Sequence, residues 1–250
     1  MRSVSIDMNK YSHKRICLWS GPRNISTALM YSFAQRPDTI VYDEPLYAHY
    51  LKQTKAKEYH PGAEEVLASM ENDGEKVVEM MMGDHPKEIV FFKNMCHHLL
   101  TLNRTFMKNV CNVILTRDPA EVIPSFAKEI ENPSMLDIGF EAQVNLLDAL
   151  VKMNAQVIVI DSNTILKNPE LELQKLCFEM GIPFFEEMLS WKKGPRTEDG
   201  IWAKHWYSNV HASTGFQPYR EKAKVVAPQL RDLYTAALPF YNRLKEFTQN

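Results

Sequence analysis

Cysteine is scarce in this sequence of 250 residues, and its spacing suits neither a metal site nor a disulfide framework. The four cysteines lie in apolar segments and form no C-x-x-C pair; they are Cys17, Cys96, Cys111 and Cys177. Reduced and buried thiols fit this pattern better than disulfides or zinc ligands. We therefore expect a protein that uses neither a metal nor redox chemistry.

An excess of charge of one sign is also missing, as is any long apolar run. The sequence has 29 Lys and Arg against 31 Asp and Glu, a formal net charge of −2. This balance gives no reason for non-specific attraction to nucleic acid or to anionic lipid. Residues 1–10 lack the apolar core of a signal peptide, and no later run approaches the roughly 18 apolar residues of a membrane span. We expect a soluble, cytoplasmic protein without a nucleic-acid or membrane partner.

Short apolar strands alternate with helical patterns along most of the chain. The strands are predicted at 15–20, 39–42, 89–93, 111–116 and 156–160, and helices at 26–35, 63–72, 120–130, 140–153 and 169–180. This alternation indicates βαβ units, and hence an α/β three-layer fold with a central parallel sheet and helices on both faces. No repeat or linker is present. We expect one domain over 1–250, with a core of about 14–205 and a closing helix at about 227–247.

The segment from Ile16 to Leu29 has the pattern of a phosphate-binding loop. It is an apolar strand, a Gly-Pro turn and the first turn of a helix that Ser26 and Thr27 open. Such a helix start offers unpaired N–H groups and the positive end of the helix dipole. Arg23 adds a cation. We expect an anion here, held by Pro22, Arg23, Asn24, Ile25, Ser26 and Thr27.

The segment is not a Walker loop. The pattern G-x-x-x-x-G-K-[ST] would need a second glycine where Ser26 stands, and its lysine is also missing. A plain ATPase or GTPase is therefore disfavoured. Taken alone, the segment also fits an ordinary strand–turn–helix junction with an incidental arginine.

Further polar residues follow the other predicted strands. In an open parallel sheet, ligands bind beyond the carboxyl ends of the strands, so these residues should meet at one edge. Each alone could be a solvated strand end, a loop residue or a packed core side chain, but their joint placement favours a site. They are Glu44 after the second strand, Lys93 at the end of the third with His97 close behind, and Arg117 after the fourth, with Ser125 about two helical turns further on.

Three motifs resemble those of sulfotransferases that use 3′-phosphoadenosine 5′-phosphosulfate (PAPS). Gly21–Thr27 resembles the 5′-phosphosulfate loop, written G-x-P-R-S-G-T-T, although Ile25 replaces the loop glycine. The segment from Leu115 to Ser125 resembles the 3′-phosphate motif. Lys192-Lys193-Gly194, with Gly200-Ile201-Trp202 downstream, resembles the C-terminal R-K-G…G-D-W element. The resemblance implies a P-loop-like fold and PAPS as the donor cosubstrate, without a metal.

The resemblance also implies roles for the phosphate-binding residues. Arg117 and Ser125 would bind the 3′-phosphate, which distinguishes PAPS from ATP. Lys192, Lys193 and Gly194 would close over the same phosphate. Because negative charge grows on the leaving nucleotide during transfer, we assign Arg23 and Lys93 to its stabilisation.

The catalytic base departs from the resemblance. Members with K-x-H after the third strand use that histidine as the base, and Met95 stands in its place here. Other branches use a glutamate after the second strand, where this chain has Glu44. We expect Glu44 to be the base, kept ionised by the nearby cation Arg23, with His97 as the second choice.

The expected reaction is transfer of a sulfuryl group from PAPS to a hydroxyl or amine of a small-molecule acceptor. Positioning and charge would supply most of the catalysis. The acceptor should lie against 46–84 and 191–216, where Tyr47, Tyr50, Trp202, Trp206 and Tyr207 could line a pocket or simply pack. Two alternatives stay open: an inert module that binds PAPS or phosphate, and a nucleotide or small-molecule kinase on a degenerate P-loop.

Overall fold

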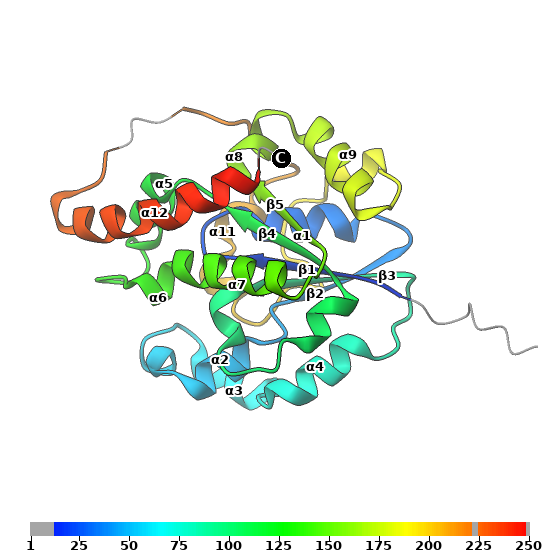
Figure 1. The fold of residues 1–250 in the computed structure, drawn as a ribbon, viewed down its shortest axis with the longest axis horizontal. Coiled ribbons are helices and arrows are strands. Elements are labelled where there is room, and N and C mark those ends of the chain that lie inside the picture. Colours follow the sequence, from blue (N-terminus) through cyan, green and yellow to red (C-terminus); the bar gives the residue numbers. More distant parts are fainter. Residues whose placement is uncertain (1–12, 222–224, 249–250) are drawn as a thin grey trace, which may run out of the picture.

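A five-stranded, fully parallel sheet lies at the centre of the fold (Figure 1). The computed structural model describes residues 13–221 and 225–248. The segment 1–10, which lacks the apolar core of a signal peptide, lies outside the described residues. The strands are β1 (Lys14–Ser20), β2 (Thr39–Asp43), β3 (Ile89–Met95), β4 (Cys111–Thr116) and β5 (Val157–Asp161), in the order β2-β3-β1-β4-β5. All five predicted strands are confirmed.

Helices connect the strands, as the sequence predicts. The α-helices are α1 (Ser26–Ala34), α2 (Tyr47–Gln53), α3 (Ala63–Ser69), α4 (Gly74–Met82), α5 (Pro119–Phe126), α6 (Met135–Ile138), α7 (Phe140–Lys152), α8 (Ser162–Lys167), α9 (Pro169–Met180), α10 (Ala203–Trp206), α11 (Ser208–His211) and α12 (Arg231–Phe247). Shorter 3₁₀ turns cover Lys55–Glu58, Cys96–Leu99, Thr105–Asn109, Glu186–Leu189 and Pro228–Leu230. The closing helix therefore begins a few residues later than predicted, after a 3₁₀ turn.

The two faces of the sheet are covered by different helices, which confirms the three-layer α/β fold (Figure 1). Alternate residues of β1 point to opposite faces. Ile16 and Leu18 pack in a core that includes residues of α1 and α9, whereas Cys17 and Trp19 pack in a second core with residues of α4, α7 and α12. All four cysteines are buried and unpaired.

The strand register brings two predicted site residues together. Strand β3 runs two residues beyond Lys93, so this lysine lies inside the strand rather than at its end. Its register partner on β2 is Asp43, and Glu44 follows directly. Within residues 13–221 and 225–248, no helix combines the length and apolar character that a membrane crossing needs.

Candidate active site

The carboxyl ends of the strands border a pocket with a volume of about 860 Å³. Most of the predicted site residues line it: Pro22, Arg23, Asn24, Ile25, Ser26, Thr27, Glu44, Lys93, His97, Arg117 and Ser125. Of the aromatic residues expected beside the acceptor, Tyr47, Trp202, Trp206 and Tyr207 line it too. The pocket lining does not include Lys192, Lys193 or Gly194. Both lysines are exposed, and the Gly194 N–H donates to the His211 carbonyl at 2.9 Å.

The loop after β1 has an unusual backbone. Arg23 and Ile25 adopt positive φ angles of 60° and 62°. This left-handed conformation costs a non-glycine residue about 1–2 kcal/mol, and it is rare for a β-branched side chain. Ile25 thus takes a glycine-like backbone at the position where the resembling motif has glycine. At Gly21 a side chain would not fit, because a Cβ there would lie 2.7 Å from the Ile138 carbonyl oxygen.

Side chains anchor this loop to the end of β4. Asn24 Nδ2 donates to the Leu115 carbonyl at 2.7 Å, and Ser162 Oγ donates to the Asn24 carbonyl at the same distance. No side chain caps the start of α1. The first-turn N–H groups of that helix, beside Ser26 and Thr27, therefore suit an anion in the pocket.

The first and second motifs are joined by direct hydrogen bonds. Arg23 Nε donates to Ser125 Oγ at 3.0 Å, and Arg117 donates to the Arg23 carbonyl at 3.1 Å. Glu121 accepts from Arg117 Nη2 at 2.6 Å, and Asn163 donates to its other oxygen at 2.7 Å. Two guanidinium groups are thus fixed on one wall of the pocket. The sequence reasoning missed Glu121, whose i,i+4 spacing from Arg117 is the signal that could have identified it.

Lys93 is fully buried between two carboxylates. Its Nζ donates to Asp43 Oδ1 at 2.8 Å and to Tyr207 Oη at 2.7 Å, and it also donates to Glu44. Burial opposes a charge on this lysine, but the attraction of Asp43 and Glu44 outweighs it and raises the pKa of the ammonium. Lys93 is therefore a permanent cation in the pocket.

Glu44 differs from the expectation in its cation partner and in its pKa. Its contact is with Lys93, whereas Arg23 bonds to Ser125. Burial raises the pKa of the Glu44 carboxyl above its usual range, and the neighbouring ammonium of Lys93 only partly opposes this effect. We expected a nearby cation to set the pKa of Glu44. This expectation is corrected, because desolvation of the buried carboxyl affects its pKa more than the cation does. A raised pKa brings a carboxylate closer to the basicity that proton abstraction requires.

His97 lies in the 3₁₀ turn that follows β3 and is 7% exposed. Burial lowers its pKa to about 3, so its ring is neutral at physiological pH. Its Nδ1 has no hydrogen-bond partner. The neighbouring His98 also lines the pocket, packs on Tyr47 with ring centroids 5.3 Å apart, and was not among the predicted site residues.

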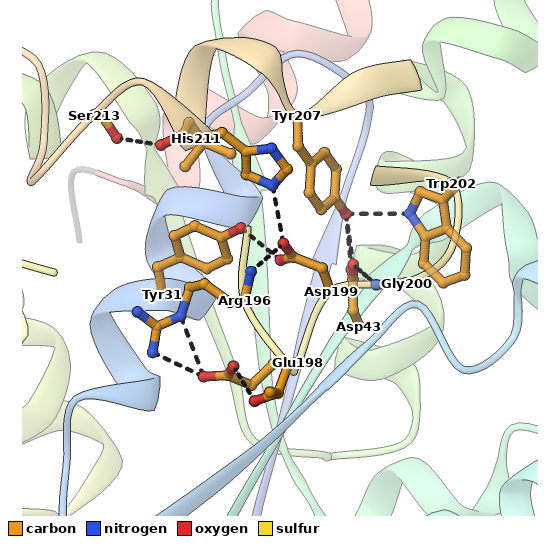
Figure 2. Close-up of polar contacts among 12 residues, drawn as sticks. Tyr31, Asp43, Arg196, Glu198, Asp199, Gly200, Trp202, Tyr207, His211 and Ser213 are labelled. Carbon is orange, nitrogen blue, oxygen red and sulfur yellow. Dashed lines mark hydrogen bonds and ion pairs between the residues drawn. The ribbon is translucent and has the colours of Figure 1, made fainter. Parts of the chain in front are cut away.

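Two carboxylates hold the segment 196–213 against β2 and α1 (Figure 2), and several residues of this segment line the pocket. Asp43 Oδ2 accepts from the Gly200 N–H at 3.0 Å, and Tyr207 Oη donates to the same carboxylate at 2.8 Å. Asp199 accepts from Tyr31 Oη and the Arg196 N–H, and it bonds to His211 Nε2 at 2.9 Å. The sequence reasoning placed Tyr207 only as a pocket-lining ring, because nothing local in the sequence signals its bonds to Asp43 and Lys93.

In the part of the chain that the structure describes, no group of three or more His, Cys, Asp or Glu side chains is arranged to hold a metal ion. The polar chemistry of the pocket is carried by guanidinium groups, an ammonium, carboxylates and imidazoles. Such a set can bind a phosphate-bearing ligand and accept a proton from a second ligand.

Solved structures resemble this fold over nearly the whole chain. The sulfotransferase domain from the curacin biosynthetic pathway is 16% identical, with a TM-score of 0.53, and the match covers 93% of this chain and 98% of that one. A sulfotransferase from Alicyclobacillus acidocaldarius is 13% identical, with a TM-score of 0.56, covering 95% and 96%. At these identities the likeness shows a shared fold, the P-loop-like α/β fold expected from the sequence.

A curated relative is much more similar in sequence. Branched-chain-amino-acid aminotransferase-like protein 1 of Arabidopsis thaliana is 41% identical over 234 residues, which is 93% of this chain. The chain spans 42% of the length of that relative. Residues 14–248 match the family described as Sulfotransferase domain. This chain therefore belongs to the sulfotransferase family.

Proposed function

We propose that this chain transfers a sulfuryl group from PAPS to a hydroxyl or amine of a small-molecule acceptor. The observation that carries the proposal is the junction of the two predicted phosphate motifs, where Arg23 bonds to Ser125 and Arg117 bonds to the Arg23 carbonyl. This junction borders the same pocket as the buried Lys93 and Glu44. Family membership supports the reaction type.

The donor would occupy the half of the pocket beside α1 and α5. The N-terminus of α1 and Arg23 would hold the 5′-phosphosulfate, and Arg117 with Ser125 would hold the 3′-phosphate. Lys128 and Arg220 also line the pocket and add positive charge. The role assigned to Lys192, Lys193 and Gly194 stays a prediction, since this exposed loop would have to approach the nucleotide when it binds.

The acceptor would attack the sulfur of PAPS in line with the bond to the leaving nucleotide. A new S–O or S–N bond forms as the bridging S–O bond breaks, and the acceptor proton passes to Glu44. The leaving adenosine 3′,5′-bisphosphate keeps the electron pair of the broken bond. Lys93 and Arg23 stabilise the negative charge that grows on its bridging oxygen. His97 is the second candidate for the base, and no metal takes part in this scheme.

Ligand binding and turnover distinguish this proposal from the two alternatives. A ligand that binds only the folded state raises the melting temperature, so thermal shift is measured with adenosine 3′,5′-bisphosphate and with ATP–Mg²⁺. Stabilisation by the bisphosphate alone supports the proposal, and stabilisation by ATP–Mg²⁺ alone supports a kinase. Consumption of PAPS in an acceptor screen separates a transferase from an inert binding module.

A further inference from the structure

Part of the pocket is lined by aromatic rings. We call this part the aromatic wall; it consists of Tyr47, His60, His97, His98, Phe126, Trp202 and Trp206. The rings pack on one another: Tyr47 meets Trp202 edge-on with centroids 5.1 Å apart, and Phe126 stacks on Trp206 at 6.2 Å. Since the donor would bind the guanidinium groups of Arg23 and Arg117, the aromatic wall is the surface left for the acceptor. This inference rests on the proposed function.

One carboxylate, that of Asp137, lines the pocket with these rings. Its residue is only 6% exposed. The carboxylate accepts from the Ser134 N–H at 2.8 Å, from Ser134 Oγ at 2.6 Å and from Tyr59 Oη at 2.8 Å. Burial alone would raise its pKa, but these bonds outweigh burial and lower the pKa below the ordinary value. Asp137 is therefore ionised at neutral pH.

Among the described residues, no lysine or arginine lies within 4 Å of the Asp137 oxygens, so none of them pairs with its negative charge. The nearby imidazoles do not supply the charge either, because burial lowers the pKa of His60 to about 4 and that of His97 to about 3. The buried ammonium of Lys93 is already held by two other carboxylates, those of Asp43 and Glu44.

The unpaired charge of Asp137 points to a missing ligand group. An ionised carboxylate out of water is normally paired with a cation. A cation next to aromatic faces gains further stabilisation from the ring quadrupoles. A cationic ligand group would therefore satisfy the carboxylate and the rings together.

We propose that the acceptor is a hydroxyl compound that carries a positively charged nitrogen, which Asp137 and the aromatic wall bind while the hydroxyl faces Glu44. The two halves of the pocket then differ in charge: Arg23, Arg117 and Lys128 face the anionic donor, and Asp137 faces the cationic acceptor. An anionic acceptor would meet the carboxylates of both Asp137 and Glu44 and is disfavoured.

Calorimetric titration of matched ligands tests this inference on the protein saturated with adenosine 3′,5′-bisphosphate. The first pair is tyramine and 4-propylphenol, and the second is choline and 3,3-dimethylbutan-1-ol; each pair compares a cation with a neutral molecule of similar shape. We expect the cation to bind at least tenfold more tightly in at least one pair. The anion 3-(4-hydroxyphenyl)propanoate should bind more weakly than tyramine. A preference for the cation of less than tenfold in both pairs overturns the inference.

Asp137→Asn should abolish the preference for the cation while the affinity for the bisphosphate stays within about twofold. Glu131→Gln is the matched control, because it removes one negative charge from an exposed position in the same segment and should keep the preference. A preference that survives in a folded Asp137→Asn variant overturns the inference. If that variant does not fold, the ligand pairs on the unchanged protein decide. Failure of the bisphosphate to bind would instead overturn the proposed function.

Discussion

Arg23 and Ser125 are 102 positions apart in the chain, yet Arg23 Nε donates a hydrogen bond to Ser125 Oγ at 3.0 Å. Arg23 belongs to the loop after β1, and Ser125 belongs to α5, which follows β4. Strands β1 and β4 are neighbours in the sheet, so the segments that follow their carboxyl ends lie side by side. The bond therefore joins two phosphate-binding motifs that the sequence presents as separate.

Arg117→Ala should weaken binding of adenosine 3′,5′-bisphosphate by roughly tenfold to a hundredfold, because a charge-assisted bidentate contact is worth about 1.5–3 kcal/mol. Adenosine 5′-phosphosulfate lacks the 3′-phosphate, so its binding should change much less. Calorimetric titration of both ligands measures the difference. Since Arg117 also bonds to Glu121 and to the Arg23 carbonyl, equal weakening of both ligands would show that its role is structural.

Glu44→Gln should lower the rate of sulfuryl transfer by roughly 10²–10⁴-fold, the usual worth of a general base. The affinity for the bisphosphate should stay nearly unchanged, because Lys93 keeps Asp43 as its partner. His97→Ala is the comparison and should have a much smaller effect. Near-native turnover in the Gln variant, together with loss of turnover in the His97 variant, would move the base to His97.

The pH dependence of the rate should also separate these two bases. A base must be deprotonated, so the rate should fall as the pH decreases through the raised pKa of Glu44, which lies above the ordinary 4.5. If His97 were the base, with a pKa of about 3, the rate would stay level well below pH 4.5. Initial rates measured from pH 8 to pH 4 distinguish the two profiles. The residual rate of Glu44→Gln should lack the acidic decline.

The sequence predicted the parts of the fold and site that depend on local pattern. The five strands alternate with helices, and residues such as Arg117 follow strand ends, where the topology of a parallel sheet places ligands. The roles of Tyr207 and Asp137 could not be predicted. Tyr207 is 114 positions away from Lys93 in the chain, and the local sequence around Asp137 indicates only a helix-capping residue. Such contacts depend on how loops fold back over the sheet, which no periodicity records.

Tyr207→Phe should lower the turnover number several-fold and leave bisphosphate affinity unchanged. The hydroxyl accepts from Lys93 and donates to Asp43, so its loss removes one polar partner of the buried ammonium while the ring packing is retained. A buried hydrogen bond to a charged group is worth about 1.5–3 kcal/mol, which sets the upper limit of the effect. Steady-state kinetics should show the change in kcat rather than in the KM for PAPS. Tyr241→Phe is the control for losing a phenol elsewhere, because its hydroxyl bonds to Asp161 and its side chain does not line the pocket. An equal fall in kcat in that variant would contradict the role of Tyr207.

The buried histidines should make the folded protein less stable as the pH falls below about 6.5. Burial lowers the pKa of His97 to about 3 and that of His60 to about 4, so between these values and the ordinary 6.5 the unfolded chain binds protons that the folded chain does not. The free energy of unfolding then decreases with falling pH, by about 1.4 kcal/mol per pH unit for each such histidine. Urea unfolding at pH 6 and pH 5 measures this slope, because in this range the unfolded histidines are mostly protonated and the folded ones are not. Both pH values stay above the range in which Asp137 would be protonated. His97→Gln should make this slope shallower by about 1.4 kcal/mol per pH unit, which corresponds to one proton. An unchanged slope in that variant would show that His97 does not remain neutral in the folded state.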